Sequence, residues 1–240
     1  DFFDLGGHSL SSTRVIAQIR MASGADVSVR TLFDAPTVRD LASAIQRRGH
    51  TTGDGTDESM PIPLHVGPRP ERIPLAPAQT RLWILQRYDP LSAAYNIPLV
   101  FRVTGRFDTH AFRDAVADVV NRHESLRTRF PMRDDEPVQD VAPPVSGERL
   151  VTFDRLTKTQ SRVRIQDDVS TWFAVTQDIP IRVGCYEVDG ENWIVSVVVH
   201  HLVADGLSML PLARDIAAAY SARREDKTPS WPALDVQYAD

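Results

Sequence analysis

Reactive side chains stand beside glycines in two short stretches of the sequence. In DFFDLGGHSL, residues 1–10, Ser9 follows two glycines and a histidine and directly precedes an apolar pattern. In HHLVADG, residues 200–206, two adjacent histidines are followed by an aspartate and a glycine. A serine hydroxyl can be activated as a nucleophile, and an imidazole can accept a proton near neutral pH. Both stretches are therefore candidate sites of chemistry.

Three interpretations compete for Ser9: a helix cap, a hydrolase nucleophile and a point of covalent attachment. The nucleophile elbow G-x-S-x-G requires a second glycine where this chain has Ser11, and it requires a buried strand before the serine. DFFDLGG is too short and too acidic to be that strand. The hydrolase interpretation therefore fails, whereas a cap and an attachment site both suit the start of a helix and stay open.

The paired histidines, His200 and His201, end a run of apolar residues that is typical of a strand. Neighbouring residues of a strand point to opposite faces, so one imidazole is expected to anchor the strand and the other to face a cleft. A metal site is not expected, because His201 and Asp205 supply two ligands and no further histidine or cysteine cluster lies nearby. Asp205 can hold a cationic partner beside the turn at Gly206.

The elements that position Ser9 are expected to be helices. Apolar residues recur at helical spacing after Ser9, and Gly24 ends this first helix. A brief turn is expected at residues 27–33, and Pro36 then begins a second helix. These helices bury too little surface for a comfortable domain, so we expect a further helix before Asp1.

The elements that position the histidines are expected to form an α/β pattern. Residues 49–73, rich in glycine, proline, threonine and acidic side chains, are typical of a linker that precedes it. Asp189 and Gly190 predict a hairpin turn between two strands. The periodicity predicts helices over 74–88 and 108–120 and from 207 onward, and strands over 97–105, 125–130, 181–188 and 192–201.

Composition limits the classes of function. Of the 240 residues 42% are hydrophobic, which can support a sizeable core, and the formal net charge of −5 argues against nucleic acid or a membrane surface as partner. Cys185 is the only cysteine, so no intramolecular disulfide is expected, and its setting predicts a buried strand thiol. No apolar run could span a bilayer and no signal peptide precedes the first motif, so a cytoplasmic location is expected.

The first stretch resembles the core motif of peptidyl carrier proteins in nonribosomal peptide synthetases. In that family the serine of LGGHS receives a 4′-phosphopantetheine arm from coenzyme A, through a phosphopantetheinyl transferase. The resemblance implies that Ser9 is the attachment site of this cofactor. A helix N-terminus suits the role, because its free N–H groups and positive dipole end favour a phosphodiester.

The second stretch resembles the HHxxxDG motif of condensation domains and their chloramphenicol-acetyltransferase-like relatives. Residues 74–98 and 122–130 resemble the first and second core motifs of that family, and residues 231–240 resemble the start of a fourth. All four motifs stand in family order. The resemblance therefore covers residues 74–240 without interruption.

Carried over residue by residue, the resemblance makes His201 the catalytic candidate, with His200 and Gly206 in the same motif. The imidazole of His201 would accept a proton or a hydrogen bond from an amine that attacks a thioester carbonyl, giving an amide and a free pantetheine thiol. A true base and a group that mainly positions the amine stay open as alternatives. Gly206 is expected to form a tight turn near the substrate channel.

Asp205 is expected to have a structural role in this motif. Its expected partner is an arginine of residues 122–130: Arg127 first, with Arg129 and Arg122 as rivals. Breaking a buried Asp–Arg pair costs about 3–5 kcal/mol. Loss of activity in an Asp205 variant would therefore not prove that its carboxylate is catalytic.

The combined interpretation is a part of a nonribosomal peptide synthetase. A small all-α carrier, truncated at its N-terminus, is expected over residues 1–48, a linker over 49–73, and an α/β lobe, the N-terminal part of a condensation domain, over 74–240. The carrier would hold the donor acyl or peptidyl thioester, and the condensation domain would form an amide with an aminoacyl thioester on a downstream acceptor carrier. An upstream adenylation domain is a further expected partner.

Two other functions stay open. One is an ester-forming or acyl-transferring relative that uses the same histidine with a hydroxyl acceptor. The other is a non-catalytic recruitment module, a class that usually has a degraded histidine motif, whereas HHLVADG is intact. The family places its active site between two lobes, of which one is expected here. The parent synthetase is therefore the expected enzyme, and activity of this stretch alone stays open.

Overall fold

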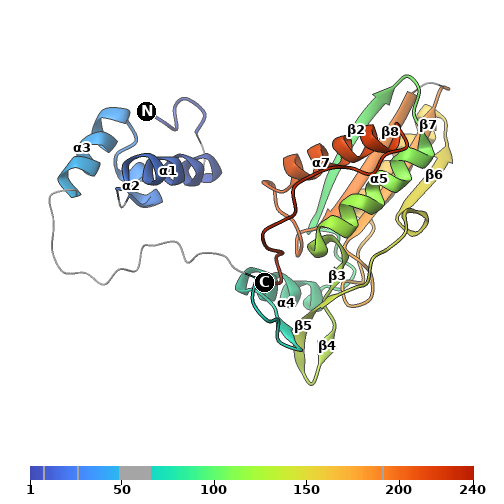
Figure 1. Ribbon diagram of the computed structural model, residues 1–240, viewed down its shortest axis with the longest axis horizontal. Helices are drawn as coiled ribbons and strands as arrows, with labels where there is room; N and C mark the ends of the chain where they lie inside the picture. The colour runs from blue at the N-terminus through green and yellow to red at the C-terminus, as the bar shows by residue number, and fades with distance from the viewer. Residues whose placement is uncertain (8, 26, 49–65, 191) are drawn as a thin grey trace. The chain divides into compact units, whose positions relative to one another are not determined.

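The structure is a computed structural model that describes residues 1–7, 9–25, 27–48, 66–190 and 192–240. The chain divides into two compact units, Asp1–Pro63 and Leu64–Asp240 (Figure 1). Each unit has a hydrophobic core of its own. Most of the expected linker, residues 49–65, lies outside the described residues.

Three helices form the smaller unit: α1 (Ser9–Ser23), α2 (Val29–Asp34) and α3 (Val38–Arg48). Gly24 follows α1 with a φ of 64°, a left-handed conformation that ends helices, as the sequence predicts. The turn expected at residues 27–33 is instead largely the short helix α2. Ser28 caps this helix, because its hydroxyl accepts a hydrogen bond from the backbone N–H of Thr31.

The core of the smaller unit is made by apolar side chains from all three helices and from the segment between α1 and α2. Its buried members are Ile16, Val27, Leu32 and Leu41. Phe2 packs against these side chains from the N-terminal loop. The loop that leads to Ser9 is therefore part of the packed unit.

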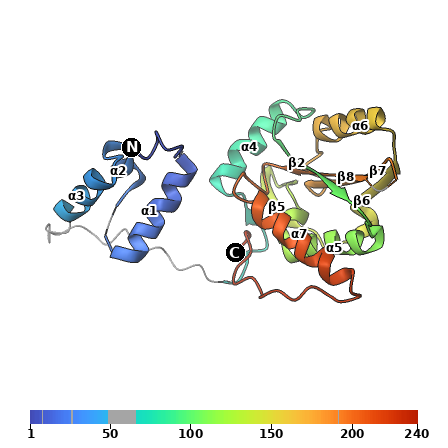
Figure 2. The same cartoon turned by 90° about the horizontal axis from the view of Figure 1, so that it is seen from above.

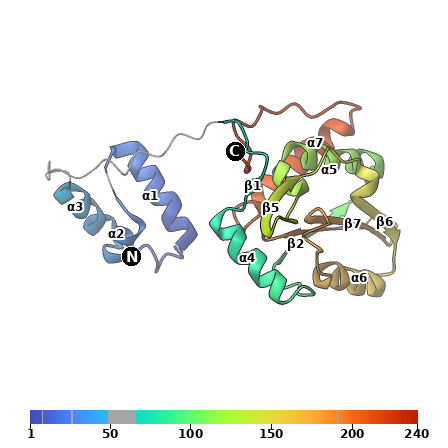
Figure 3. The same ribbon diagram turned by 90° about the horizontal axis from the view of Figure 1, so that it is seen from below.

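A four-stranded sheet is the frame of the larger unit, in the order β2-β8-β7-β6. Its strands are β2 (Asn96–Thr104), β8 (Asn192–His200), β7 (Ile181–Val188) and β6 (Val151–Arg155). β2, β8 and β7 pair antiparallel, whereas β6 runs parallel to β7. Figure 2 and Figure 3 show α5 (Thr109–Arg122) and α7 (Met209–Arg223) on one face of the sheet and α6 (Lys158–Ser170) on the other.

The central strand β8 is buried on both faces. Val197 packs into the main core with α5 and α7, and Val198 packs on the opposite face against Trp83 and Phe173. A strand that is buried on both faces reads as an almost unbroken apolar run, which is how residues 193–199 read. His200 shares the face of Val198, because side chains alternate along a strand.

Several predicted elements of the larger unit are confirmed. β7 and β8 form the hairpin, with Asp189 and Gly190 in left-handed conformation at φ 55° and 79°. α5 begins after Asp108, whose carboxylate accepts a hydrogen bond from the backbone N–H of Ala111 at 2.9 Å. Cys185 in β7 is a buried free thiol, and this burial raises its pKa above the usual range.

A second, smaller sheet lies beside the main one. Its strand β5 (Glu136–Val141) pairs with β1 (Ile73–Pro74), β3 (Thr128–Arg129) and β4 (Met132–Arg133), and α4 (Pro77–Tyr88) follows β1. The strand expected over 125–130 is largely wrong, because Glu124–Arg127 forms the 3-10 helix η1 and only two residues of that stretch are in a strand. η1 follows α5 after one residue and carries Leu126 into the main core.

The segment at residues 231–240 is irregular and packs against η1 and the end of α5. Gln237 donates through Nε2 to the last carbonyl of α5 at 2.9 Å and accepts at Oε1 from the backbone N–H of Glu124 at 3.1 Å. Arg69 pairs with both Glu124 and Asp240, each at 2.7 Å. The stretches that resemble the second and fourth family motifs are therefore adjacent in space.

Neither a membrane-spanning helix nor a metal-binding cluster occurs within the described residues. Each described helix is too short or too polar to cross a bilayer. Over the same part of the chain, no group of three or more His, Cys, Asp or Glu side chains is placed to hold a metal ion.

Candidate functional site

The loop before Ser9 is held by two glycines and by Phe2. Gly6 has a φ of 90°, a conformation that favours glycine, and Gly7 lies so close to the ring and backbone of Phe2 that no side chain fits there. Phe2 donates its backbone N–H to the carbonyl of Pro36 at 2.8 Å, which ties the loop to the connection between α2 and α3. Ser9 is the first residue of α1, and its side chain lies outside the part that the structure describes.

His200 ends β8 with a fully buried side chain. Its Nδ1 accepts a hydrogen bond from the backbone N–H of Leu202 at 3.1 Å, and its Nε2 lies 3.3 Å from Oε1 of Gln86. Because Nδ1 accepts, the neutral ring carries its proton on Nε2 and donates it to Gln86. These two bonds fix the tautomer and hold the turn that follows β8.

Two glutamines of α4 support this turn. Gln86 donates through Nε2 to the carbonyls of Pro90 at 3.1 Å and Ser92 at 3.3 Å, so its amide is oriented with Oε1 toward the imidazole. Gln79 donates through Nε2 to the carbonyl of Leu202 at 3.1 Å. α4 therefore holds both the buried histidine ring and the backbone just beyond it.

Burial, and to a smaller degree the neighbouring His201, lowers the pKa of His200 to about 4. His200 is consequently neutral near pH 7. Both of its ring nitrogens are engaged inside the protein, so this imidazole has no free nitrogen to offer an incoming amine. His200 therefore anchors the end of β8.

His201, by contrast, is exposed. Its backbone N–H donates to the carbonyl of Tyr95 at 2.8 Å, which fixes the main chain at this residue. Within the described residues its imidazole forms no hydrogen bond or ion pair. The two adjacent histidines therefore differ as the strand alternation predicts, one buried and one accessible, and the catalytic role of His201 stays a prediction.

Asp205 pairs with Ser208. Its Oδ1 accepts from the backbone N–H of Ser208 at 2.9 Å and from the hydroxyl at 2.7 Å, and its own N–H donates to that hydroxyl at 3.1 Å. These bonds, with the side chain of Ser208 first among them, lower the pKa of the Asp205 carboxyl. The carboxylate thus fixes the turn that leads into α7.

The expected pairing of Asp205 with an arginine is wrong, because each candidate is engaged with nearer groups. Arg127 is buried, donates to the carbonyl of Ala142 and lies 3.5 Å from the carboxylate of Glu124. The two rivals are paired as well: Arg129 with Asp140 at 2.6 Å and Arg122 with Asp215 at 3.2 Å. Arg127 therefore supports the backbone around β3 and β5 and does not form the expected pair with Asp205.

Gly206 lies in the turn after β8 but is not required there by the described structure. Its φ lies outside the left-handed region, and a Cβ at this position would meet nothing within 4 Å. A pocket of about 460 Å³ lies between this turn and α7, with His123, Asp205 and Pro211 among its lining residues. His201 does not line this pocket, and the cleft expected beside it stays a prediction.

Gln79, Trp83 and Gln86 are residues that the sequence analysis did not single out. They stand three to four residues apart on α4 and therefore share one face, and all three are buried. Trp83 donates its indole N–H to the carbonyl of Phe130 at 3.0 Å. Two amide side chains on the buried face of a helix are the signal that reveals them, because buried polar groups require partners.

A small helical unit with a serine at a helix start precedes an α/β lobe that carries a histidine pair at the end of its central strand. Residues 70–240 match the family model of the condensation domain, and residues 1–45 match that of the phosphopantetheine attachment site. The chain therefore belongs to the condensation domain family, with an attachment domain on the N-terminal side. Such an attachment domain implies covalently bound 4′-phosphopantetheine.

Similar proteins are nonribosomal peptide synthetases. The chain is 41% identical to CymA, a probable nonribosomal peptide synthetase of Salinispora arenicola, over all of this chain and 3% of that protein. It is 36% identical to a dimodular nonribosomal peptide synthase of Bacillus subtilis, over all of this chain and 10% of that protein. The chain thus spans a tenth or less of the length of these relatives, and the predicted family is confirmed.

Two solved structures support the fold of the larger unit. The X-domain from teicoplanin biosynthesis matches with a TM-score of 0.69 and 33% identity, over 74% of this chain and 38% of that chain. The starter condensation domain of the rhizomide synthetase RzmA matches with a TM-score of 0.61 and 24% identity, over 68% of this chain and 40% of that chain, which shows the fold alone. The predicted fold class, a short helical carrier region with a condensation-type α/β lobe, is confirmed.

Proposed function

We propose that this chain takes part in peptide-bond formation within a nonribosomal peptide synthetase. Residues 1–48 act as the carrier, residues 49–73 as the linker and residues 74–240 as the N-terminal lobe of the condensation domain. Ser9 is the attachment site, and His201 is the catalytic residue that contacts the attacking amine. An upstream adenylation domain supplies the donor, and a downstream carrier presents the acceptor.

The start of α1 suits attachment of phosphopantetheine. α1 is 15 residues long and has no acidic residue in its first turn, so its free N–H groups can face an anionic phosphodiester without opposing charge. Gly6 and Gly7 add no side chains of their own to the loop before Ser9. When attached, the group supplies a long arm with a terminal thiol that carries acyl groups as thioesters.

The observation that carries the catalytic proposal is the contrast between the two histidines. His200 is neutral, buried and hydrogen-bonded through both ring nitrogens. His201 is exposed, with its backbone fixed to Tyr95 and its imidazole without a partner among the described residues. A buried anchor beside an accessible imidazole is the arrangement that a proton acceptor needs.

His201 would act on an amine that attacks a thioester carbonyl. The amine nitrogen forms a bond to the carbonyl carbon, the carbon–sulfur bond breaks, and the acyl group becomes an amide. The amine gives one proton to the imidazole, and the departing sulfur takes one proton up, so His201 returns to its neutral form. Asp205 contributes by fixing the turn into α7 rather than by handling protons.

Attachment at Ser9 is tested by mass. The protein is incubated with coenzyme A and a promiscuous phosphopantetheinyl transferase, and intact masses are measured for wild type, Ser9→Ala and Ser43→Ala. Ser43 is an exposed serine of α3 and serves as the matched control. One phosphopantetheine is expected on wild type and on Ser43→Ala, and none on Ser9→Ala. Addition of the group to Ser9→Ala would refute the assignment.

The role of His201 is tested in the parent synthetase that contains this chain. His201→Gln is expected to lower the single-turnover rate of amide formation by about 10²–10⁴-fold, the usual contribution of a positioned acid or base. His110→Gln, which changes an exposed histidine of α5, is the control and should leave the rate unchanged. Carrier loading is measured in parallel, so that a defect in loading is not mistaken for a defect in condensation.

Similarity to the X-domain favours one second candidate, a non-catalytic recruitment module. The solved X-domain is 33% identical to this chain, and a further matching structure is the complex of the X-domain with OxyB. A wild-type rate in His201→Gln would refute the catalytic role of His201, and absence of amide formation at this domain in the wild type would favour this candidate. Neither outcome would affect the assignment of attachment at Ser9, because attachment is measured separately by intact mass.

A further inference from the structure

An arginine-lined pocket lies at the end of the sheet where β6 and β7 begin. Its volume is about 760 Å³, which is in the range of pockets for small organic ligands. Four arginines line it, from four different segments of the chain: Arg129, Arg149, Arg164 and Arg182. Asp178 is the only acidic residue among those that line it in the described part of the chain.

Two of these arginines already have acidic partners. Arg129 pairs with Asp140 at 2.6 Å, although its Nε is buried without a hydrogen-bond partner. Arg164 lies 3.4 Å from Asp168 and donates through Nε to the hydroxyl of Tyr186 at 3.1 Å. These contacts hold both guanidinium groups in fixed places at the wall of the pocket.

The other two arginines have no acidic partner within ion-pair distance among the described residues. Arg182 donates to the backbone carbonyls of Asp168 and Thr171 at 3.2 Å and of Trp172 at 3.3 Å, and its guanidinium lies 4.3 Å from the centre of the Phe173 ring. Arg149 is exposed, and its guanidinium forms neither a hydrogen bond nor an ion pair among the described residues.

The charge of Arg182 is only partly compensated. Burial lowers its pKa, and the neighbouring Arg164 adds to this effect, while Asp168 and Asp178 oppose it. An anion bound in the pocket would offset the cost of burying this charge. Asp178 accepts a hydrogen bond from the backbone N–H of Ala174 at 3.1 Å, so its carboxylate is partly engaged elsewhere.

The remaining walls of the pocket are largely apolar. They comprise Ala142, Pro143, Pro144, Val145, Leu150, Phe173, Ile179, Ile181 and Val183, together with the polar residues Thr152 and Gln177. A ligand that fits this pocket therefore combines an anionic head with an apolar body. A guanidinium fork binds phosphate in bidentate geometry, and one carboxylate could satisfy only part of the positive charge gathered here.

We propose that this pocket binds a phosphate monoester that carries an apolar group. Arg149 and Arg182 supply the charge that the ligand neutralises, Arg129 and Arg164 add fixed donors, and Phe173 with the aliphatic walls holds the apolar group. The site goes beyond the proposed condensation reaction and does not depend on it. Neither Ser9 nor His201 is part of it.

The test is calorimetric titration of the full chain with phenyl phosphate at about pH 7 and low salt. Benzoate, benzyl alcohol and inorganic phosphate are titrated in parallel: benzoate tests the ring with a single charge, benzyl alcohol the uncharged ring, and inorganic phosphate the anion without an apolar group. Saturable one-to-one binding of phenyl phosphate is expected, with weaker binding of each of the other three. Absence of saturable binding, or equal affinity for benzoate, would overturn the proposal.

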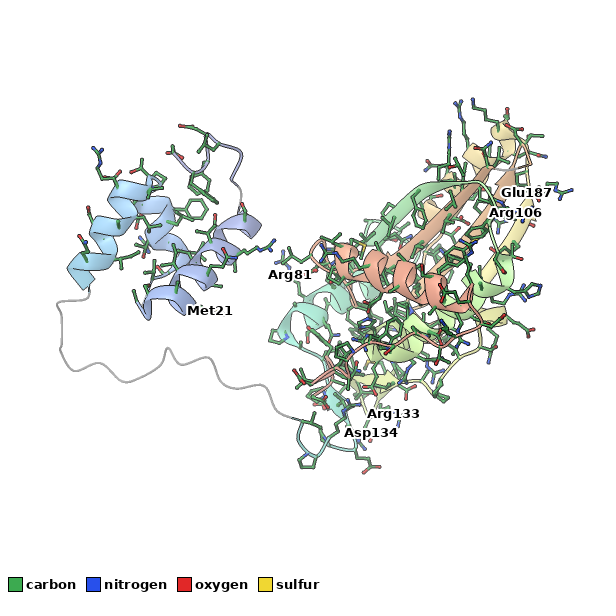
Figure 4. The ribbon with its side chains drawn as sticks, turned by 45° about the horizontal axis from the view of Figure 1, so that its top comes forward. Met21, Arg81, Arg106, Arg133, Asp134 and Glu187 are labelled. Carbon is green, nitrogen blue, oxygen red and sulfur yellow. The ribbon has the colours of Figure 1, made fainter. Side chains whose placement is uncertain are left out.

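Variants then locate the site. Arg149→Gln and Arg182→Gln are each expected to weaken phenyl phosphate binding by about tenfold or more, the usual effect of losing one charged hydrogen bond. Arg106→Gln is the matched control, since Arg106 lines a different pocket together with Glu187 at the other end of β7 (Figure 4). Arg149 is exposed and unpaired in the described structure, so its variant keeps the test decisive even if Arg182→Gln disturbs α6. Wild-type affinity in Arg149→Gln would overturn the proposal.

Discussion

His200 is held neutral by the folded protein, and this has a consequence for stability. Its pKa is lowered from 6.5 to about 4 by burial, whereas the unfolded chain has the ordinary value. As the pH falls below about 6.5, the unfolded state binds the proton first, and the free energy of unfolding of the larger unit decreases. The full loss, reached below about pH 4, is about 3 kcal/mol. Urea unfolding between pH 7 and pH 4 measures it.

Substitution of His200 separates this contribution from that of other groups. In His200→Gln the loss of unfolding free energy between pH 7 and pH 4 should shrink by about 3 kcal/mol. His110→Gln, which changes an exposed histidine of α5, is the control substitution. A wild-type slope in His200→Gln would show that another group titrates in this window.

Asp205 offers a second prediction at the scale of single residues. Asp205→Ala and Ser208→Ala should be coupled by about 1 kcal/mol in a double-mutant cycle, because each side chain is the partner of the other. Asp205→Ala and Arg127→Gln should be additive, because no contact joins them. Both cycles are measured by urea unfolding, and a coupling confined to Arg127 would contradict the structure.

At the scale of elements, α4 stabilises the turn after β8 through side-chain hydrogen bonds. Gln79→Met removes the donor to the carbonyl of Leu202 and leaves a buried carbonyl without that partner, at a cost of about 1–3 kcal/mol. Gln166→Met changes an exposed glutamine of α6 and should cost less than about 0.5 kcal/mol. Thermal unfolding of the two variants gives the comparison, and equal stability would show that α4 does not hold the turn.

The elements also show how far sequence reasoning reaches. The hairpin of β7 and β8 and the helix α5 follow from local signals, Asp189–Gly190 and the helical spacing of residues 108–120, and both were predicted. The 3-10 helix η1 was not predicted, because residues 125–130 have the sequence pattern of a strand. The structure instead forms η1, which buries Leu126 in the main core. Such burial depends on the distant strands of the main sheet.

Part of the candidate site could also be predicted from the sequence, and part could not. One buried and one accessible histidine follow from the alternation of a strand, so that contrast could be predicted. The partner of Asp205 could not, because several arginines stood at suitable sequence positions and spacing does not rank them. Ser208, three residues away, satisfies the carboxylate locally, and a turn-forming Asp-x-x-Ser pattern would have been the signal to weigh.

At the scale of the whole molecule, the two units have separate cores, which makes their stabilities separable. All four tryptophans, at positions 83, 172, 193 and 231, belong to the larger unit, so tryptophan fluorescence reports that unit alone. Gly7→Ala forces Phe2 from its place and should destabilise the smaller unit by about 1–3 kcal/mol. Circular dichroism should then lose helical signal at lower temperature while the tryptophan transition stays unchanged. A shift of the tryptophan transition would contradict separate cores.

The position of β8 at the centre of the sheet also sets an order of events during synthesis. Among the described strands β2 pairs only with β8, which the ribosome makes about a hundred residues later. At a synthesis rate of about 5–20 residues per second, roughly 5–20 s pass before β8 is made and can pair with β2. β8 itself is a valine-rich segment with no proline, the kind of sequence that associates between chains when exposed. The nascent chain therefore passes through a period in which β2 has no partner in the main sheet, and this period ends when β8 is made.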